Sequence, residues 1–110
     1  MRAEALKGHL DVLLLAVLDG EPRHGYAIIE ALRDSSRGRF DLPTGTVYPA
    51  LHRLETRGLV RSGWSVVAGR RTYRLTAAGR RALADQRSAW RDFSQAVSAV
   101  LQDEPWPATP

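Results

Sequence analysis

Residues 44–55 read Thr-Gly-Thr-Val-Tyr-Pro-Ala-Leu-His-Arg-Leu-Glu, and the apolar spacing of this stretch decides how the whole chain is interpreted. At helical spacing one side of the stretch is apolar and should face a core; it consists of Val47, Ala50, Leu51 and Leu54. We expect a helix over about 46–57 with Thr46 as its N-cap. This start places Pro49 in the first turn, where a missing N–H costs little. Gly58 then ends the helix.

The opposite side of this predicted helix has small or flat residues at its start and hydrogen-bonding residues along its length. It consists of Gly45, Tyr48, Pro49, His52, Arg53 and Thr56. A helix that enters the DNA major groove needs such a face, with little bulk where bases approach and with donors or acceptors that reach base edges. An ordinary solvated helix face would look similar, so this helix alone leaves both interpretations open.

The segments on either side give a mainly helical fold with one β-hairpin. We expect helices over about 4–19, 24–35, 46–57 and 77–102, with strands over 59–66 and 71–75 joined by a turn over 68–70. Thr76 should cap the last helix, and prolines make the end of the chain irregular. This order is that of a winged helix-turn-helix. We divide the chain into a winged helix-turn-helix domain over 1–76, a C-terminal helix over 77–102 and a tail over 103–110.

Charge is concentrated in the middle of the chain. Between Arg33 and Arg81 there are 11 cations and 3 anions, a local charge of +8, while residues 1–32 and 82–110 each carry −2. The predicted hairpin tip contains Gly69-Arg70-Arg71, and cations on such a tip suit contact with phosphates or the minor groove. The pattern favours a polyanionic partner. An arginine-biased composition without any partner is the alternative.

Several other classes of function are disfavoured. With 110 residues and no cysteine, the chain has the length of one domain and no thiolate chemistry. Its histidines, His9, His24 and His52, have no short metal-type spacing, and no nucleophile motif surrounds a serine. The longest apolar run is 7 residues, from Val12 to Leu18, too short to cross a bilayer. We therefore expect a cytoplasmic protein that is not an enzyme and has no metal, cofactor or membrane partner.

The last predicted helix carries an apolar stripe that needs a partner. Leu83, Trp90 and Val97 lie seven residues apart, and Phe93 with Val100 forms a second line. The first predicted helix is also apolar on most sides. Together the two helices favour a homodimer. The alternative is that the stripe packs on the first helix of the same chain.

The sequence resembles the PadR family of transcriptional regulators, in its short form. The resemblance covers about residues 6–101 and rests on Leu6–Leu10 with Gly25-Tyr26, on Thr44–Glu55 with Gly58-Leu59, and on Gly69–Thr76 with Gly79. It implies a homodimeric repressor of the winged-helix type. By position it implies DNA contacts from the recognition helix and its start and from the wing: Gly45, Thr46, Tyr48, Pro49, His52, Arg53, Arg70 and Arg71.

The resemblance also implies that both terminal helices pair across the dimer. The residues expected there are Leu6, Leu10, Leu14, Leu83, Trp90, Phe93 and Val97. Some members of the family bind flat apolar molecules between tryptophans at the position of Trp90, which makes a planar aromatic effector one interpretation and a purely packing role the other. We therefore expect a sequence-specific repressor of double-stranded DNA that an effector releases. The alternative is a winged-helix module that binds another protein and no DNA.

Overall fold

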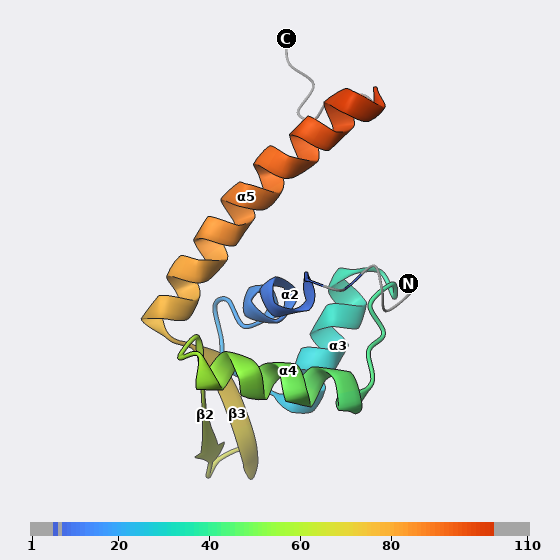
Figure 1. Cartoon of the computed structure of the whole chain (residues 1–110). Helices are drawn as coiled ribbons and strands as arrows, with labels where there is room; N and C mark the ends of the chain where they lie inside the picture. The colour runs from blue at the N-terminus through green and yellow to red at the C-terminus, as the bar shows by residue number, and fades with distance from the viewer. Residues whose placement is uncertain (1–5, 7, 103–110) are drawn as a thin grey trace.

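The computed structural model describes residue 6 and residues 8–102. Its elements in chain order are α2 (Leu10–Val17), β1 (Arg23–His24), α3 (Gly25–Ser35), α4 (Thr44–Thr56), β2 (Val60–Ser65), β3 (Arg70–Leu75) and α5 (Ala77–Leu101), as labelled in Figure 1. The protein is mainly helical with a small antiparallel sheet and a long last helix, as predicted. The arrangement is a winged helix.

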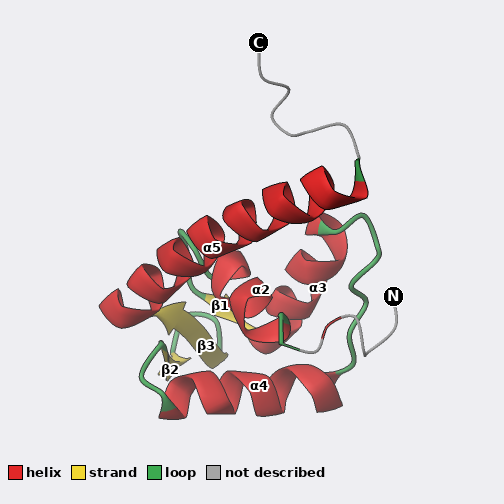
Figure 2. Ribbon diagram, turned by 45° about the horizontal axis from the view of Figure 1, so that its top comes forward, coloured by secondary structure: helices red, strands yellow, loops and turns green. Residues whose placement is uncertain are grey.

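The core lies among the helices at the foot of α5. Figure 2 shows α2 and α3 between α5 and α4. The apolar side predicted for α4 is confirmed, because Val47, Ala50, Leu51 and Leu54 have no exposed surface. They pack in one cluster with Leu14, Leu18, Ile28, Leu32, Val60, Leu75 and Leu83. Burial of each large aliphatic side chain contributes about 1.5–3 kcal/mol, so this cluster fixes the orientation of α4.

The predicted hairpin is present and gains one strand that the sequence did not indicate. The strand order is β1-β3-β2, with Val60 opposite Leu75 and Ser62 opposite Tyr73. β1 has only two residues and pairs Arg23 with Tyr73, so it is too short for an alternating pattern to reveal it. The turn occupies residues 66–69, and Arg70 therefore begins β3 instead of ending the turn.

The first helix is shorter than predicted. We expected a helix over 4–19, but α2 spans Leu10–Val17. Gly8 has a φ of +84°, a left-handed conformation that interrupts a right-handed helix. Residues 1–5 and 7 lie outside the described part of the chain. The apolar spacing continues through the glycine, which is why the predicted helix is too long.

The start of α4 also differs from the prediction. The helix begins at Thr44 with Pro43 as N-cap, and no side chain caps it. Thr46, the predicted cap, lies inside the helix and its N–H donates to the carbonyl of Pro43 over 3.0 Å. Pro49 therefore lies in the second turn, where the missing N–H leaves the carbonyl of Gly45 without its helical donor. Pro43, already extended at φ −77° and ψ 160°, serves as the cap without a polar side chain.

α5 begins and ends close to its predicted limits. The Oγ1 of Thr76 accepts the N–H of Gly79 over 3.0 Å and donates to the carbonyl of Gly58 over 2.7 Å. Gly79 and Leu83 are the buried residues of this helix, so its first turns pack on the core. Beyond them α5 extends away from the other elements (Figure 1). The predicted tail over 103–110 lies outside the described residues.

Candidate nucleic-acid interface

The exposed side of α4 has a central row and two flanks. Gly45, Pro49, His52 and Thr56 are exposed and lie at helical spacing opposite the buried row. Tyr48 lies on the flank toward the start of α3, and Arg53 lies on the flank toward α2. The predicted DNA-reading residues of α4 are therefore on one helix, but only the central row is directed straight away from the core.

Tyr48 packs against the start of α3. Its side chain is 38% exposed, and its hydroxyl occupies the space that a Cβ at Gly25 would need. Any side chain at position 25 would displace this ring. The Gly-Tyr of residues 25–26 and the Tyr-Pro of residues 48–49 are therefore linked by a direct contact between α3 and α4, which holds Tyr48 at the edge of the exposed face.

The other flank of α4 is joined to α2 by ion pairs. The Nη2 of Arg53 lies 3.4 Å from Oδ1 of Asp11, and the Nη1 of Arg57 lies 3.3 Å from Oδ2 of the same carboxylate. Sequence reasoning assigned Arg53 to DNA and did not identify Asp11. The two partners are 42 positions apart in the chain, and no local pattern marks them.

The wing is attached to α4 through a carboxylate. Oε2 of Glu55 accepts the hydroxyl of Ser62 over 2.7 Å and its backbone N–H over 3.0 Å. Ser62 Oγ in turn accepts Nη1 of Arg71 over 3.1 Å. The hydrogen bond from the Ser62 side chain, helped by its backbone N–H and by the charge of Arg71, lowers the pKa of Glu55 below its ordinary value of 4.5 against the effect of burial. This network orients Arg71 relative to α4.

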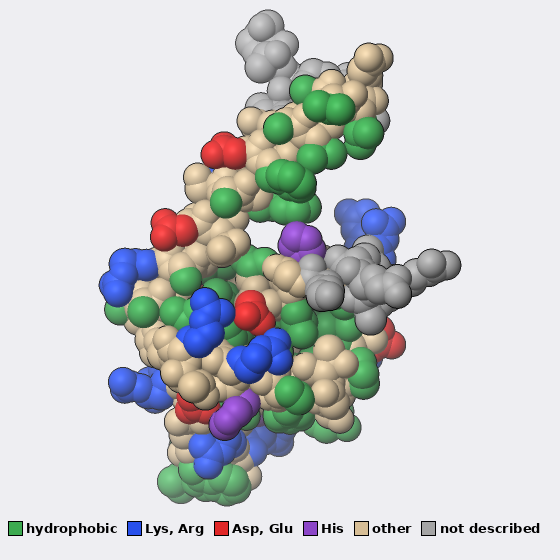
Figure 3. Space-filling view, in the orientation of Figure 1, with side chains coloured by type: hydrophobic (Ala, Val, Ile, Leu, Met, Phe, Trp, Pro, Cys, Tyr) green, Lys and Arg blue, Asp and Glu red, His purple; other side chains and the backbone are tan. Residues whose placement is uncertain are grey.

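The basic residues of the wing lie in its strands, and the tip itself is apolar. Val67 is fully exposed and Val66 nearly so. Hydrophobic side chains accordingly cover the end of the hairpin in Figure 3, with basic side chains above them. Arg70 begins β3, where its Nη1 lies 3.0 Å from Nε2 of His24. The expectation of a basic tip is thus corrected, because Arg70 and Arg71 pair within the sheet instead of turning with the loop.

The face of the sheet away from α4 carries two further cations. Arg61 and Arg74 are exposed and directly opposite each other on β2 and β3. Like charges in this position destabilise a strand pair.

The residues expected at a dimer interface fall into two groups. Leu6, Leu14 and Leu83 are buried within the chain, so they support the core and present almost no surface. Trp90 and Phe93 are 55% and 60% exposed, and their ring centroids lie 6.1 Å apart. Leu10 and Val97 are half-buried. Figure 3 shows hydrophobic side chains gathered along the projecting part of α5.

Trp90 has a neighbour at the start of α2. The ring of His9 meets it edge-on, with the ring centroids 5.7 Å apart. The indole is therefore partly covered within one chain, and its remaining surface lies beside Phe93.

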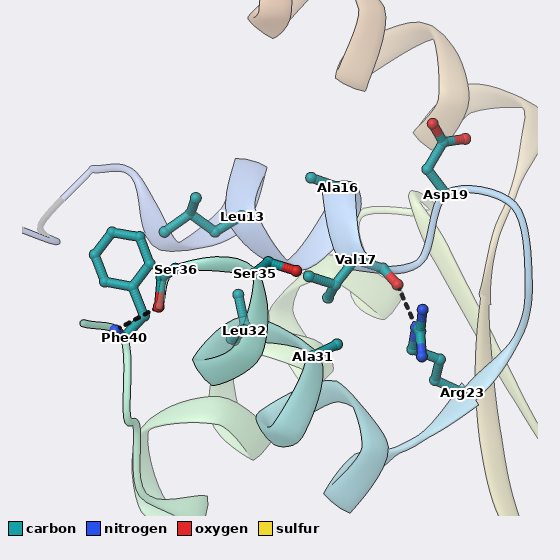
Figure 4. A pocket seen from close by; sticks show the side chains of 10 residues that line it. All are labelled: Leu13, Ala16, Val17, Asp19, Arg23, Ala31, Leu32, Ser35, Ser36 and Phe40. Atoms are coloured by element: carbon teal, nitrogen blue, oxygen red, sulfur yellow. Dashed lines mark hydrogen bonds between the residues drawn. The ribbon is translucent and has the colours of Figure 1, made fainter. Parts of the chain in front are cut away.

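A separate cavity of about 300 Å³ lies between α2 and α3. Figure 4 shows aliphatic side chains of both helices around it, with Phe40 at one end and Asp19 and Arg23 toward the other. Arg23 is already engaged there, because its Nε donates to the carbonyl of Val17 over 2.6 Å. None of the residues predicted to bind DNA or an effector lines this cavity.

Neither a metal-binding cluster nor a membrane span is found in the part of the chain that the structure describes. Among residues 6 and 8–102, no group of three or more His, Cys, Asp or Glu could hold a metal ion. No helix within these residues is long and apolar enough to span a membrane.

Replacement of Ser62 by Ala tests the link between α4 and the wing. We expect the pKa of Glu55 to rise toward 4.5, because its largest stabilising hydrogen bond is lost. A carboxylate with a lowered pKa stabilises the fold above its unfolded-state pKa, and this contribution disappears as the pH falls through the folded-state value. The variant should therefore lose about 1 kcal/mol near neutral pH and less in acid. NMR titration measures the pKa of Glu55, and urea unfolding at neutral and at acidic pH measures the loss of stability. An unchanged pKa of Glu55 in the variant would contradict the hydrogen-bond network.

Comparison with known proteins places this winged helix among transcriptional regulators. The model of the transcriptional regulator PadR-like family matches residues 14–85. The match covers more than half of the chain, which therefore belongs to the PadR-like family of transcriptional regulators, a family of regulators and not of enzymes.

Relatives and solved structures agree with this assignment. The transcriptional regulator Rv3488 of Mycobacterium tuberculosis is 43% identical over 76 residues, which cover 67% of this chain and 68% of that protein. A PadR family transcription regulator from Clostridium difficile R20291 is 31% identical with a TM-score of 0.76, covering 86% of this chain and 99% of that one. A PadR-like transcriptional regulator from Bacillus cereus is 26% identical with a TM-score of 0.80, covering 93% and 100%.

Proposed function

We propose that the protein binds double-stranded DNA sequence-specifically, with α4 in the major groove and the wing on the neighbouring backbone. The observation that carries this proposal is the exposed central row of α4, opposite a fully buried row and beside a wing with Arg70 and Arg71. A helix whose one side packs in the core and whose other side is exposed to solvent can approach base edges without disturbing the fold.

Each group of residues has a distinct role in this proposal. His52 offers ring nitrogens to base edges, and Tyr48 lies beside it on the same exposed surface. The N–H of Thr46 is already donated to Pro43, so the amide of Gly45 is the better phosphate ligand at the helix start. Arg70 and Arg71 contact phosphates from the wing.

The proposed active form is a homodimer that represses transcription. The exposed part of α5 carries Trp90 and Phe93, and such apolar surface is typical of an interface. Two winged heads related by a two-fold axis would read half-sites about 34 Å apart. An effector that inserts a planar ring beside Trp90 would alter the spacing of the heads and release the DNA.

Replacement of Phe93 by Asp tests the dimer. The wild type should have a light-scattering mass of about twice 12.2 kDa at micromolar concentration. We expect the variant to fold but to shift toward the monomer, because a charge would be buried in an apolar contact. The matched control is Ser88→Asp, which adds the same charge at an exposed position on the opposite side of α5. A wild-type mass near 12 kDa would contradict the proposal.

Selection from a random duplex library tests the DNA proposal and requires no known operator. We expect enrichment of a palindromic sequence whose half-sites are about one helical turn apart. Absence of any enriched sequence, with no retention of duplex at low salt, would favour the alternative of a protein-docking module.

A further inference from the structure

One carboxylate of α2 holds two arginines of α4. Asp11 contributes one oxygen to Arg53 at 3.4 Å and the other to Arg57 at 3.3 Å. The two arginines are one helical turn apart on the same flank of α4. Asp11 therefore neutralises half of the positive charge on this flank.

In the DNA complex proposed above, the same two guanidinium groups would lie near the phosphates that border the groove. Arg53 follows His52 and Arg57 follows Thr56, so each stands beside a residue of the exposed central row. Long cationic side chains that flank a groove-binding helix reach the phosphate oxygens at the edges of that groove. In the DNA complex that we propose, Arg53 and Arg57 thus have two possible anionic partners, a phosphate and Asp11.

These ion pairs are weak enough to be exchanged. The side chains of Arg53 and Arg57 are 57% and 61% exposed, and that of Asp11 is 35% exposed. Each pair uses a single nitrogen and a single oxygen, without the paired bonds of a strong arginine–carboxylate contact. Exposed pairs of this kind contribute little to stability, so a phosphate can replace the carboxylate.

We propose that Asp11 competes with DNA phosphates for Arg53 and Arg57 and so lowers the affinity of the protein for DNA. This inference rests on the proposed DNA-binding function. The competition is confined to the recognition helix, because neither wing arginine pairs directly with a carboxylate: Arg70 contacts His24, and Arg71 contacts Ser62, which separates it from Glu55. Arg70 and Arg71 can therefore bind phosphates without first releasing a carboxylate, whereas Arg53 and Arg57 of α4 cannot.

The test compares two variants that remove the same charge. Asp11→Asn should bind a mixed-sequence duplex about three- to tenfold more tightly than the wild type at low salt. The slope of log affinity against log salt should steepen by about one to two units per dimer, because released arginines make new phosphate contacts. Asp19→Asn is the control, since Asp19 pairs with Arg87 of α5 at 3.2 Å and not with α4. It should change affinity less than about twofold.

A second comparison isolates the two arginines. With Arg53→Gln and Arg57→Gln in place, the gain from Asp11→Asn should disappear. Thermal melting of each variant establishes that it is folded. Weaker binding by Asp11→Asn, or a gain no larger than that of Asp19→Asn, would overturn the competition while leaving DNA binding intact. A wild type that binds no duplex would overturn the proposed function as well.

Discussion

Gly79→Ala should lower the free energy of unfolding by about 3 kcal/mol, the largest stability effect expected of a single methyl group in this chain. The added Cβ would overlap the carbonyl oxygen of Leu59. This oxygen belongs to the backbone and already accepts the N–H of Thr76 over 3.1 Å, so it cannot move without breaking the junction between the sheet and α5. Urea unfolding measures the change.

Gly45→Ala is the matched control. Gly45 and Gly79 both lie in the first turn of a helix, but a Cβ at Gly45 meets no described atom within 4 Å. Alanine is the better helix former, so this variant should be unchanged or up to about 1 kcal/mol more stable. Equal losses in the two variants would show that the contact between α5 and Leu59 is not the cause.

His52→Ala should weaken binding to the selected duplex by about 1–3 kcal/mol per half-site and leave binding to scrambled DNA nearly unchanged. His52 is exposed on the central row of α4 and carries no structural hydrogen bond through its ring among the described residues. Its loss should therefore remove a contact to bases without disturbing the fold. Fluorescence anisotropy with both duplexes measures the difference.

Arg71→Ala provides the contrasting result. It should weaken binding to both duplexes by a similar factor and flatten the salt slope by about one unit for each phosphate that the variant no longer neutralises. If Arg71→Ala changed sequence preference while His52→Ala lost only nonspecific affinity, the roles of α4 and the wing would be reversed.

The faces of α4 could be predicted because they depend on local periodicity. Val47, Ala50, Leu51 and Leu54 repeat at helical spacing, and the structure buries all four. The start of the same helix could not be predicted in this way. The position of Pro49 favoured Thr46 as the cap, whereas the helix begins after Pro43 without a side-chain cap.

Contacts between segments that are far apart in the chain could not be predicted from the sequence. The pairing of Asp11 with Arg53 joins residues 42 positions apart, and the bond from Glu55 to Ser62 crosses from a helix to a strand. Each residue alone is an ordinary charged or polar side chain. The burial of Leu14 and Leu83 within one chain could not be predicted for a similar reason. An apolar stripe shows that a helix needs a partner, but it does not show whether that partner is the same chain or a second copy.

The central claim is that α4 reads bases while the wing binds phosphates, and competition binding across a range of salt concentrations tests it most directly. The wild-type protein would be titrated with the selected duplex and with its scrambled counterpart. We predict that both affinities fall along parallel lines as salt rises, with the selected duplex about 10³-fold tighter or more throughout. Equal affinities for the two duplexes at every salt concentration would contradict base reading by α4.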